Sequence, residues 1–272
     1  MKIFLDSAEV DEIVQARSYG VLDGVTTNPS LIKKAVATLQ GRGEQVDMRG
    51  YIERLLWEAK GVPVSLEVIG SDCQTIIEQG RFLYKTFNPI ARNAYIKVPV
   101  NPAYGPDSQA HFDGLKAIRT LSGEGVPINC TLIFTPEQAM LAAKAGAVIV
   151  SPFAGRVDDL LRQKNGQAFE KTDYFPAEGL ESGSVLDDNG IVSGIDLVAQ
   201  CVDLLERYGL ETEVLAASLR NPRQTREAAL VGAHIATLPF GVISKLLLHE
   251  KTMEGMQKFT DDVVPEYAEL LK

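Results

Sequence analysis

The sequence predicts an α/β protein with a single (β/α)8 barrel of the TIM type and an additional C-terminal helix, on three observations. Short apolar segments alternate with helical segments eight times along the 272 residues, which is typical of a parallel sheet. The length fits one barrel of ordinary size. Seven of the eight apolar segments have a polar residue at or near the carboxyl end, and that end carries the active site in such barrels.

Apolar runs and helix caps define the elements of the first half. The run that ends at Asp6 predicts the first strand, and Ser7 is then the expected N-cap of a helix that Gly20 ends. Asn28 is the expected N-cap of the next helix, because Pro29 stands at its first position. The expected strands are 1–5, 24–26, 62–68 and 94–100, and the expected helices are 7–20, 28–39, one around 52–56, and one that Ser71 caps and that ends before 88.

The second half continues the alternation and has two long irregular segments. The expected strands are 126–134, 147–151, 213–218 and 234–238, and the expected helices are one that ends near 121, 136–146, 157–162, 191–208, one from 222, and 239–248. The loops expected at 101–109 and 163–190 are long, and loops of such length are usually functional or mobile. An amphipathic tail helix is expected at about 252–271.

The chain is therefore expected to be one barrel domain, 1–272, since no linker divides it. A doubly wound open sheet is the alternative architecture. It is less favoured, because no GxGxxG or P-loop motif follows any strand.

Composition excludes several function classes. The net charge of −9 argues against nucleic acid or an anionic membrane as a partner. Three dispersed cysteines indicate free thiols in a reducing cytoplasm rather than disulfides or a zinc site. Three histidines far apart in the sequence argue against a histidine-rich metal cluster, so no metal is expected. The sequence opens with neither the basic region nor the apolar region of a signal peptide, and no apolar run is long enough to span a membrane. A cytoplasmic location is therefore expected.

Lys97 is the most informative residue, because it interrupts the apolar run AYIKVPV at 94–100. Lysine is rarely buried without a partner, and burial lowers the pKa of a lysine, which favours the nucleophilic neutral amine. This pattern favours a Schiff-base lysine. The alternative is an edge strand whose lysine reaches back to solvent.

Glu67, inside VSLEV, is a second anomaly, since a carboxylate in such a strand needs a partner. On neighbouring strands, Lys97 and Glu67 would pair with each other. The other polar residues at strand ends are Asp6, Thr26 with Asn28, Asn129 with Thr131, Ser151 and Ser218. Taken singly, Asp6 and Asn28 are also explained as helix caps and Ser151 as a turn residue.

A Schiff-base reaction requires such a set, because an acid/base must shuttle protons and hydroxyl groups must position a water. It requires neither a metal nor an organic cofactor. Arg156 follows the sixth strand and Arg220 the seventh. Loops after late barrel strands often bind phosphate, and guanidinium groups suit phosphate oxygens, so this placement favours a phosphate site over two surface arginines.

Seven motifs resemble the transaldolase family and its relatives, the fructose-6-phosphate aldolases. They follow the family's order over most of the barrel: FLDSA at 4–8, DGVTTNPSLI at 23–32, SLEV at 65–68, YIKVP at 95–99, INCTLIFT at 128–135, SPFAGRVDD at 151–159 and AASLRNPRQ at 216–224. The resemblance implies a barrel that moves a dihydroxyacetone unit from a ketose phosphate, such as sedoheptulose 7-phosphate, to an aldose phosphate, such as glyceraldehyde 3-phosphate.

The resemblance also implies a role for each residue that matches a motif. Lys97 would form the imine, Asp6 would be the acid/base of C–C cleavage, and Glu67 with Thr131 would hold the water of imine formation. The substrate-binding set would be Asn28 and Asn129 for donor hydroxyls, Ser151 and Phe153 beside the donor, and Arg156, Ser218 and Arg220 for the phosphate.

Three positions bear on the choice between transfer and simple cleavage. The simple aldolases resemble this chain but carry glutamine at Glu67 and tyrosine at Phe134 and Phe153. Without a phenol near the imine, protonation of the enamine is disfavoured, which favours transfer. Reversible aldol cleavage, a specialised sugar-phosphate transfer and a non-catalytic sugar-phosphate-binding protein are the alternatives. The tail helix is expected to have an apolar side, and smaller members of the family form rings through the same helix. Both points favour a homo-oligomer.

Overall fold

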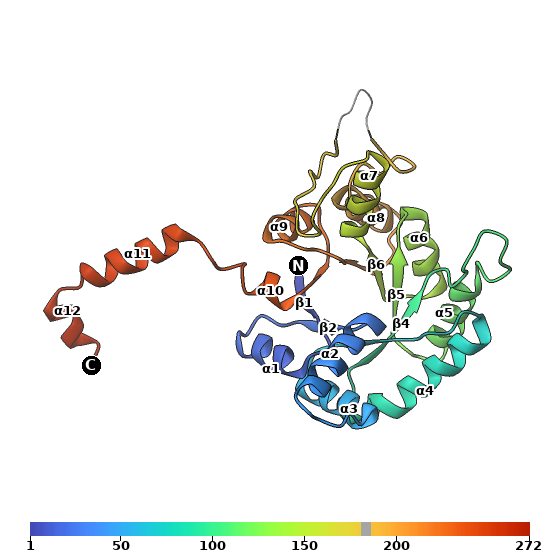
Figure 1. The fold of residues 1–272 in the computed structure, drawn as a ribbon, viewed down its shortest axis with the longest axis horizontal. Helices are drawn as coiled ribbons and strands as arrows, with labels where there is room; N and C mark the ends of the chain where they lie inside the picture. The colour runs from blue at the N-terminus through green and yellow to red at the C-terminus, as the bar shows by residue number, and fades with distance from the viewer. Residues whose placement is uncertain (181–185) are drawn as a thin grey trace.

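The computed structural model describes residues 1–180 and 186–272 and contains a closed barrel of eight parallel strands. The strands follow one another around the barrel in sequence order, and β8 pairs with β1 to close it (Figure 1). The strands are β1 (Lys2–Asp6), β2 (Gly24–Thr26), β3 (Val64–Glu67), β4 (Ala94–Pro99), β5 (Ile128–Ile133), β6 (Ile149–Pro152), β7 (Glu213–Ala216) and β8 (Ile235–Leu238). The predicted (β/α)8 architecture is confirmed.

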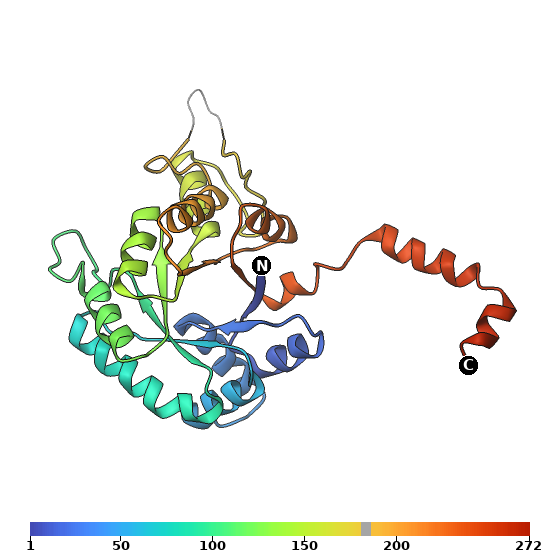
Figure 2. The same cartoon turned by 180° about the vertical axis from the view of Figure 1, so that it is seen from behind.

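Helices surround the sheet, as the view from behind in Figure 2 also shows. They are α1 (Val10–Ser18), α2 (Pro29–Gly41), α3 (Met48–Glu58), α4 (Cys73–Ala91), α5 (Asp113–Gly123), α6 (Pro136–Ala145), α7 (Ala154–Lys164), α8 (Gly194–Arg207), α9 (Pro222–Leu230), α10 (Phe240–Ile243), α11 (Glu250–Asp261) and α12 (Pro265–Leu270). Among the described residues, no helix is both long and apolar enough to cross a lipid bilayer.

Two apolar clusters stabilise the barrel. The larger lies between the strands and the helices, where the buried residues are mostly aliphatic. The smaller fills the barrel interior with Phe4, Ile149, Phe153, Leu215, Ala217 and Ile235. Gly24 belongs to this packing, because a Cβ there would lie 2.4 Å from the Phe4 ring. Strand β2 therefore reaches β1 only with glycine at this position.

Several predicted helix starts are wrong, for local reasons. Ser7 does not cap α1, which has Glu9 as its N-cap residue. The Ser7 hydroxyl instead accepts a hydrogen bond from the Glu9 N–H at 3.0 Å and donates one to Glu12. Asp72, and not Ser71, caps α4, since its carboxylate accepts from the Thr75 N–H at 2.9 Å.

Other predicted helix bounds also need correction. Pro89 lies inside the last turns of α4, which continues to Ala91. The helix expected at 157–162 begins at Ala154, directly after β6, and the helix expected at 239–248 is the short α10.

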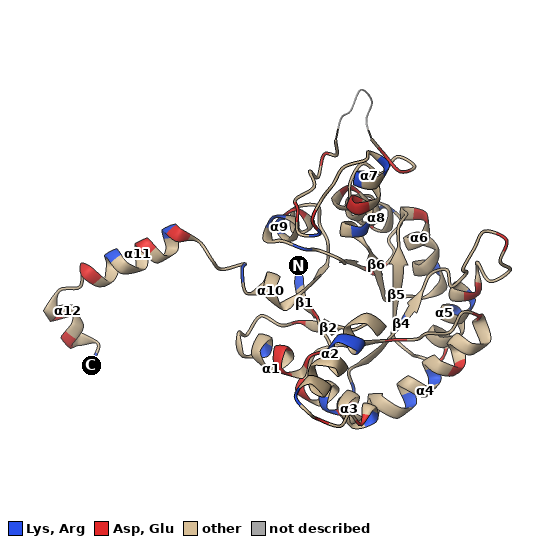
Figure 3. Cartoon of the chain, in the orientation of Figure 1, with Lys and Arg blue, Asp and Glu red and all other residues tan. Residues whose placement is uncertain are grey.

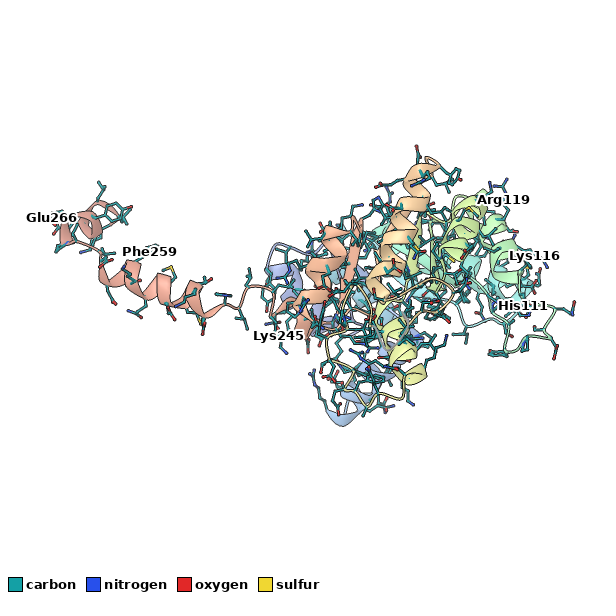
Figure 4. All side chains as sticks on the ribbon, turned by 90° about the horizontal axis from the view of Figure 1, so that it is seen from above. His111, Lys116, Arg119, Lys245, Phe259 and Glu266 are labelled. Atoms are coloured by element: carbon teal, nitrogen blue, oxygen red, sulfur yellow. The ribbon has the colours of Figure 1, made fainter. Side chains whose placement is uncertain are left out.

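The tail is two helices rather than one. Val264 is extended, with ψ 148°, because Pro265 follows it and disfavours the helical conformation in the preceding residue. None of the described residues of α11 or α12 is buried, and both helices stand away from the barrel in Figures 1 and 2. Figure 4 shows the same separation from above, with Phe259 and Glu266 on the tail and His111 and Lys116 at the opposite end of the molecule.

Acidic and basic residues are mixed over the outer helices, as Figure 3 shows for α4 and α11. The predicted long loop between α7 and α8 includes residues 181–185, which lie outside the described residues. Its described part packs on the barrel, since Phe175 is buried and the Arg162 guanidinium donates to the Asp173 carbonyl at 2.9 Å.

Candidate active site

The carboxyl ends of the strands bring the predicted polar residues into one ring. Parallel pairing places Asp6 of β1 beside Thr26 of β2. It likewise places Lys97 of β4 between Glu67 of β3 and Asn129 of β5. Because the sheet is closed, side chains from different strands converge at one end of the barrel.

Lys97 lies inside the barrel and is not a surface lysine. Its side chain is 5% exposed, and β4 has β3 on one side and β5 on the other, so the edge-strand alternative is wrong. The ammonium lies 3.1 Å from the Glu67 carboxylate and donates to the Thr27 carbonyl at 3.2 Å. The expected pairing of Lys97 with Glu67 is confirmed.

Asp6 lies in the same cavity as Lys97. Burial raises the pKa of Asp6, and Lys97, the hydrogen bond from Thr26 and the Arg156 charge lower it in part. The Thr26 hydroxyl donates to the Asp6 carboxylate at 2.7 Å, and it lies 2.5 Å from the Thr237 hydroxyl. The Asp6 carboxyl is thus held by Thr26 and retains its proton more firmly than that of an exposed aspartate.

A buried hydrogen-bonded chain orients the amide of Asn129. Its Nδ2 donates to the Ser65 hydroxyl at 3.1 Å, and its Oδ1 accepts from the Ser151 hydroxyl at 2.7 Å. The Thr131 hydroxyl is also buried, but it has no hydrogen-bond partner among the described protein atoms. Thr131 does not line the cavity that contains Lys97 and Asp6.

Two hollows meet at Asn28. The cavity is lined by Asp6, Thr26, Asn28, Lys97, Ser151, Phe153, Arg156, Leu215, Ala217, Ser218 and Thr237. Glu67 does not line it. Glu67 lines a neighbouring, largely apolar groove between α2, α3 and α4, together with Thr27 and Asn28. Because Asn28 lines both hollows, it lies at their boundary.

The predicted phosphate residues are near one another, but they are not equally placed. Arg156 lines the cavity, is exposed, and lies with its guanidinium 4.7 Å from the centre of the Phe153 ring. Ser218 also lines the cavity and has a left-handed φ of 62°. Arg220 lies outside the cavity lining, where its guanidinium makes two hydrogen bonds with Asp159, at 2.6 and 2.5 Å.

Sequence reasoning missed four residues that contact the site. Ser65 and Thr237 are the hydroxyl partners named above, and Asp159 and Gln224 hold Arg220. Thr237 interrupts the apolar strand IATL at 235–238, which is the same signal that singled out Glu67. Within the described residues, no three His, Cys, Asp or Glu side chains form a group suited to a metal ion.

Comparisons with known proteins identify the family of the chain. The family model described as transaldolase/fructose-6-phosphate aldolase matches residues 3–270. A probable transaldolase of Desulfatibacillum aliphaticivorans is 40% identical over 262 residues, which cover 96% of this chain and 97% of that protein. Probable transaldolases of Chlorobium phaeobacteroides strain DSM 266 and Clostridium perfringens strain 13 are 40% and 38% identical over the same length, covering 96% of this chain and 96% and 97% of those proteins.

Proposed function

The chain belongs to the transaldolase/fructose-6-phosphate aldolase family, and we propose that it is a transaldolase that transfers a dihydroxyacetone unit from a ketose phosphate to an aldose phosphate through an imine on Lys97. The observation that carries the proposal is the position of Lys97. Its ammonium is almost fully buried, 3.1 Å from the Glu67 carboxylate, and it lines one cavity with Asp6. Sedoheptulose 7-phosphate and glyceraldehyde 3-phosphate are the proposed type of donor and acceptor.

The first half of the reaction forms the imine. The neutral amine of Lys97 attacks the donor ketone, and the carbinolamine then loses water to give the iminium. Glu67 is the base within hydrogen-bond reach of Lys97 that takes up the ammonium proton. The free hydroxyl of Thr131 is the proposed partner of the water.

The second half breaks and remakes a C–C bond. Asp6 takes the proton of the donor hydroxyl next to the bond that breaks, the aldose phosphate leaves as an aldehyde, and the bonding electrons move into the iminium to give an enamine. The enamine then attacks the acceptor aldehyde, and Asp6 returns the proton to the new hydroxyl. Water finally hydrolyses the imine. The proposed steps use groups of the chain, the two substrates and water.

Two aromatic residues support transfer over simple cleavage. The rings of Phe134 and Phe153 lie 5.9 Å apart, and the Lys97 Nζ is 5.9 Å from the centre of the Phe153 ring. Neither ring carries a hydroxyl that would protonate the enamine. The enamine therefore persists until an acceptor aldehyde arrives.

Reductive trapping tests the proposal. We expect fructose 6-phosphate and borohydride to give a covalent adduct, which peptide mass spectrometry assigns to Lys97. The Lys97→Met variant, which keeps an unbranched apolar chain, is the control and should give none. If the wild-type protein forms no adduct with any ketose phosphate, the chemistry proposed for Lys97 is wrong. Sustained release of free dihydroxyacetone without an acceptor would instead identify a simple aldolase.

We also propose that copies of the chain associate through the tail. The exposed apolar residues of α11, α12 and the turn between them are Met253, Met256, Phe259, Val263, Val264, Tyr267 and Leu270. Such a surface is costly to leave in water, and it is not covered by the barrel of its own chain. A cytoplasmic location is proposed as well, because Cys73, Cys130 and Cys201 are all free thiols.

A further inference from the structure

Arg220 is bound on one end of its guanidinium by residues outside the cavity. The side chain is 14% exposed and lies between α7 and the loop that follows it. Nη1 donates to Asp159 Oδ1 at 2.6 Å and to the Lys171 carbonyl at 3.0 Å. Nη2 donates to Asp159 Oδ2 at 2.5 Å. These three bonds use the end of the group that is farthest from its side-chain stem.

The remaining donors form a second fork. A guanidinium has five N–H groups in one plane, and the three bonds leave the Nε–H and one Nη2–H. Among the described residues, neither has a protein acceptor. Both lie on the same edge of the plane, so together they match the spacing of two phosphate oxygens. Asp159 thus occupies one end of Arg220 without occupying this edge.

The neighbouring backbone brings Arg220 against the first turn of α7. A Cβ on Gly155 would lie 2.3 Å from the Ser218 carbonyl, 2.9 Å from Arg220 Nε and 3.1 Å from Arg220 Cζ. Glycine is therefore needed for this approach. The first turn of a helix favours an anion, because its N–H groups lack intrahelical partners and the helix dipole is positive there.

The main chain of Arg220 is held as firmly as its side chain. Its N–H donates to Gln224 Oε1 at 2.9 Å, and Gln224 Nε2 donates to Asp158 Oδ2 at 2.9 Å. The other Asp158 oxygen accepts from the Gly194 N–H at 2.7 Å. Both ends of the arginine are thus connected to α7.

We infer that Asp159 is a positioning residue for the substrate phosphate: it holds the Nη1/Nη2 end of Arg220 so that the Nε/Nη2 edge stays directed for bidentate binding of a phosphate monoester. This inference rests on the proposed function, since it concerns the phosphate of the same substrates. A different role for Asp159 predicts the opposite change in phosphate affinity. If Asp159 only competed with phosphate for the arginine charge, removing its charge would tighten phosphate binding.

The Asp159→Asn variant separates the two roles. An asparagine accepts with one oxygen only, so the two-point hold on Arg220 is lost while side-chain size is kept. We expect the KM for fructose 6-phosphate and the inhibition constant of inorganic phosphate to rise roughly 10- to 100-fold, because a misplaced charged group loses about this much. The kcat, and the kcat/KM for non-phosphorylated fructose, should change little.

Two further variants serve as controls. Asp203→Asn makes the same chemical change on an exposed part of α8, so its KM should match that of the wild-type protein. Arg220→Lys is the second test, because a single ammonium cannot hold Asp159 at two points and also offer a two-donor edge. It should raise the same KM, and combining it with Asp159→Asn should add little further.

Each result of these experiments either supports or overturns the role of Asp159. An unchanged or lower KM for the phosphorylated ketose in Asp159→Asn overturns the inference, and so does an equal loss with both ketoses, which indicates general damage. If Asp159→Asn does not fold, Asp159→Glu is measured by the same criteria, because it keeps the charge but displaces the two acceptor oxygens from Arg220. Borohydride trapping on Lys97 in the wild-type protein is read separately, so failure of the imine chemistry is distinguishable from failure of the role of Asp159.

Discussion

The Glu67→Gln substitution is the most direct perturbation of the proposed chemistry. It keeps the size and hydrogen-bonding capacity of the side chain and removes its charge. The Lys97 ammonium then loses its ionic partner at 3.1 Å and keeps the Thr27 carbonyl at 3.2 Å. The variant should therefore lower both the free energy of unfolding and the rate of imine formation, and the two effects are measured separately.

The magnitudes follow from burial. Removing one partner of a fully buried ion pair costs about 3–5 kcal/mol, and losing a hydrogen bond to a charged group costs about 1.5–3 kcal/mol. The Glu67 side chain is 15% exposed, so water screens part of the charge and the lower range applies. We expect a loss of about 1.5–3 kcal/mol in the free energy of unfolding. Loss of a positioned base should slow imine formation about 10²- to 10⁴-fold.

Two assays measure these effects. Denaturant unfolding gives the stability change, and timed borohydride quenching with fructose 6-phosphate gives the rate of imine formation. Glu206→Gln makes the same chemical change on an exposed part of α8 and should alter neither quantity. The double variant Glu67→Gln with Lys97→Met should recover stability without activity, because both charges are gone. Imine formation at the wild-type rate in Glu67→Gln would refute the role given to this carboxylate.

Four further predictions concern other parts of the chain. Asp6→Asn should still yield a borohydride adduct but lower transfer turnover about 10²- to 10⁴-fold in a coupled assay, since the C–C step loses its base. Arg220→Ala should raise the KM for fructose 6-phosphate and affect fructose less. Burial raises the pKa of Asp158 from 3.8 to about 6, so the native state binds its proton more tightly than the unfolded state. The tighter binding of this proton stabilises the native state fully below pH 4, and this stabilisation, at most about 3 kcal/mol, is lost as the pH rises through 6. Urea unfolding at pH 4 and 7 measures the loss, with Asp158→Asn as the reference variant. Deleting 249–272 should lower the mass measured by light scattering to that of a monomer, and an unchanged mass would exclude the tail as the interface.

The barrel was predictable because buried parallel strands are nearly continuous apolar runs. Lys97 and Glu67 stand out against that background, and register alone then pairs them across β3 and β4. Helix caps were less predictable, since several residues near a helix start are able to cap it. At the start of α4, Asp72 is the cap in place of Ser71, because the Thr75 hydroxyl, three residues later, also donates to the Asp72 carboxylate.

The surroundings of the phosphate arginine were not predictable from the strand pattern. Asp159 and Arg220 are 61 positions apart, and their contact depends on how the loop after β7 packs against α7 at Gly155. The motif SPFAGRVDD does contain Asp159 one helical turn beyond Gly155, which is the spacing of side chains on one helix face. From that spacing, Asp159 could have been inferred to lie on the same face of the helix as Gly155, toward the proposed phosphate site.

The arrangement of the two carboxylates explains how one amine would serve two different proton transfers. Asp6 shares the cavity with Lys97, whereas Glu67 approaches the same ammonium from the groove side. A substrate bound in the cavity would meet Asp6 at its hydroxyls, while Glu67 remains next to the nitrogen. Burial also raises the pKa of Asp6, which suits a group that must accept a proton in cleavage and return it in transfer. If this division holds, Asp6→Asn stops the reaction after the imine and Glu67→Gln slows it before the imine, so the two variants should differ in how much trapped adduct accumulates rather than only in overall rate.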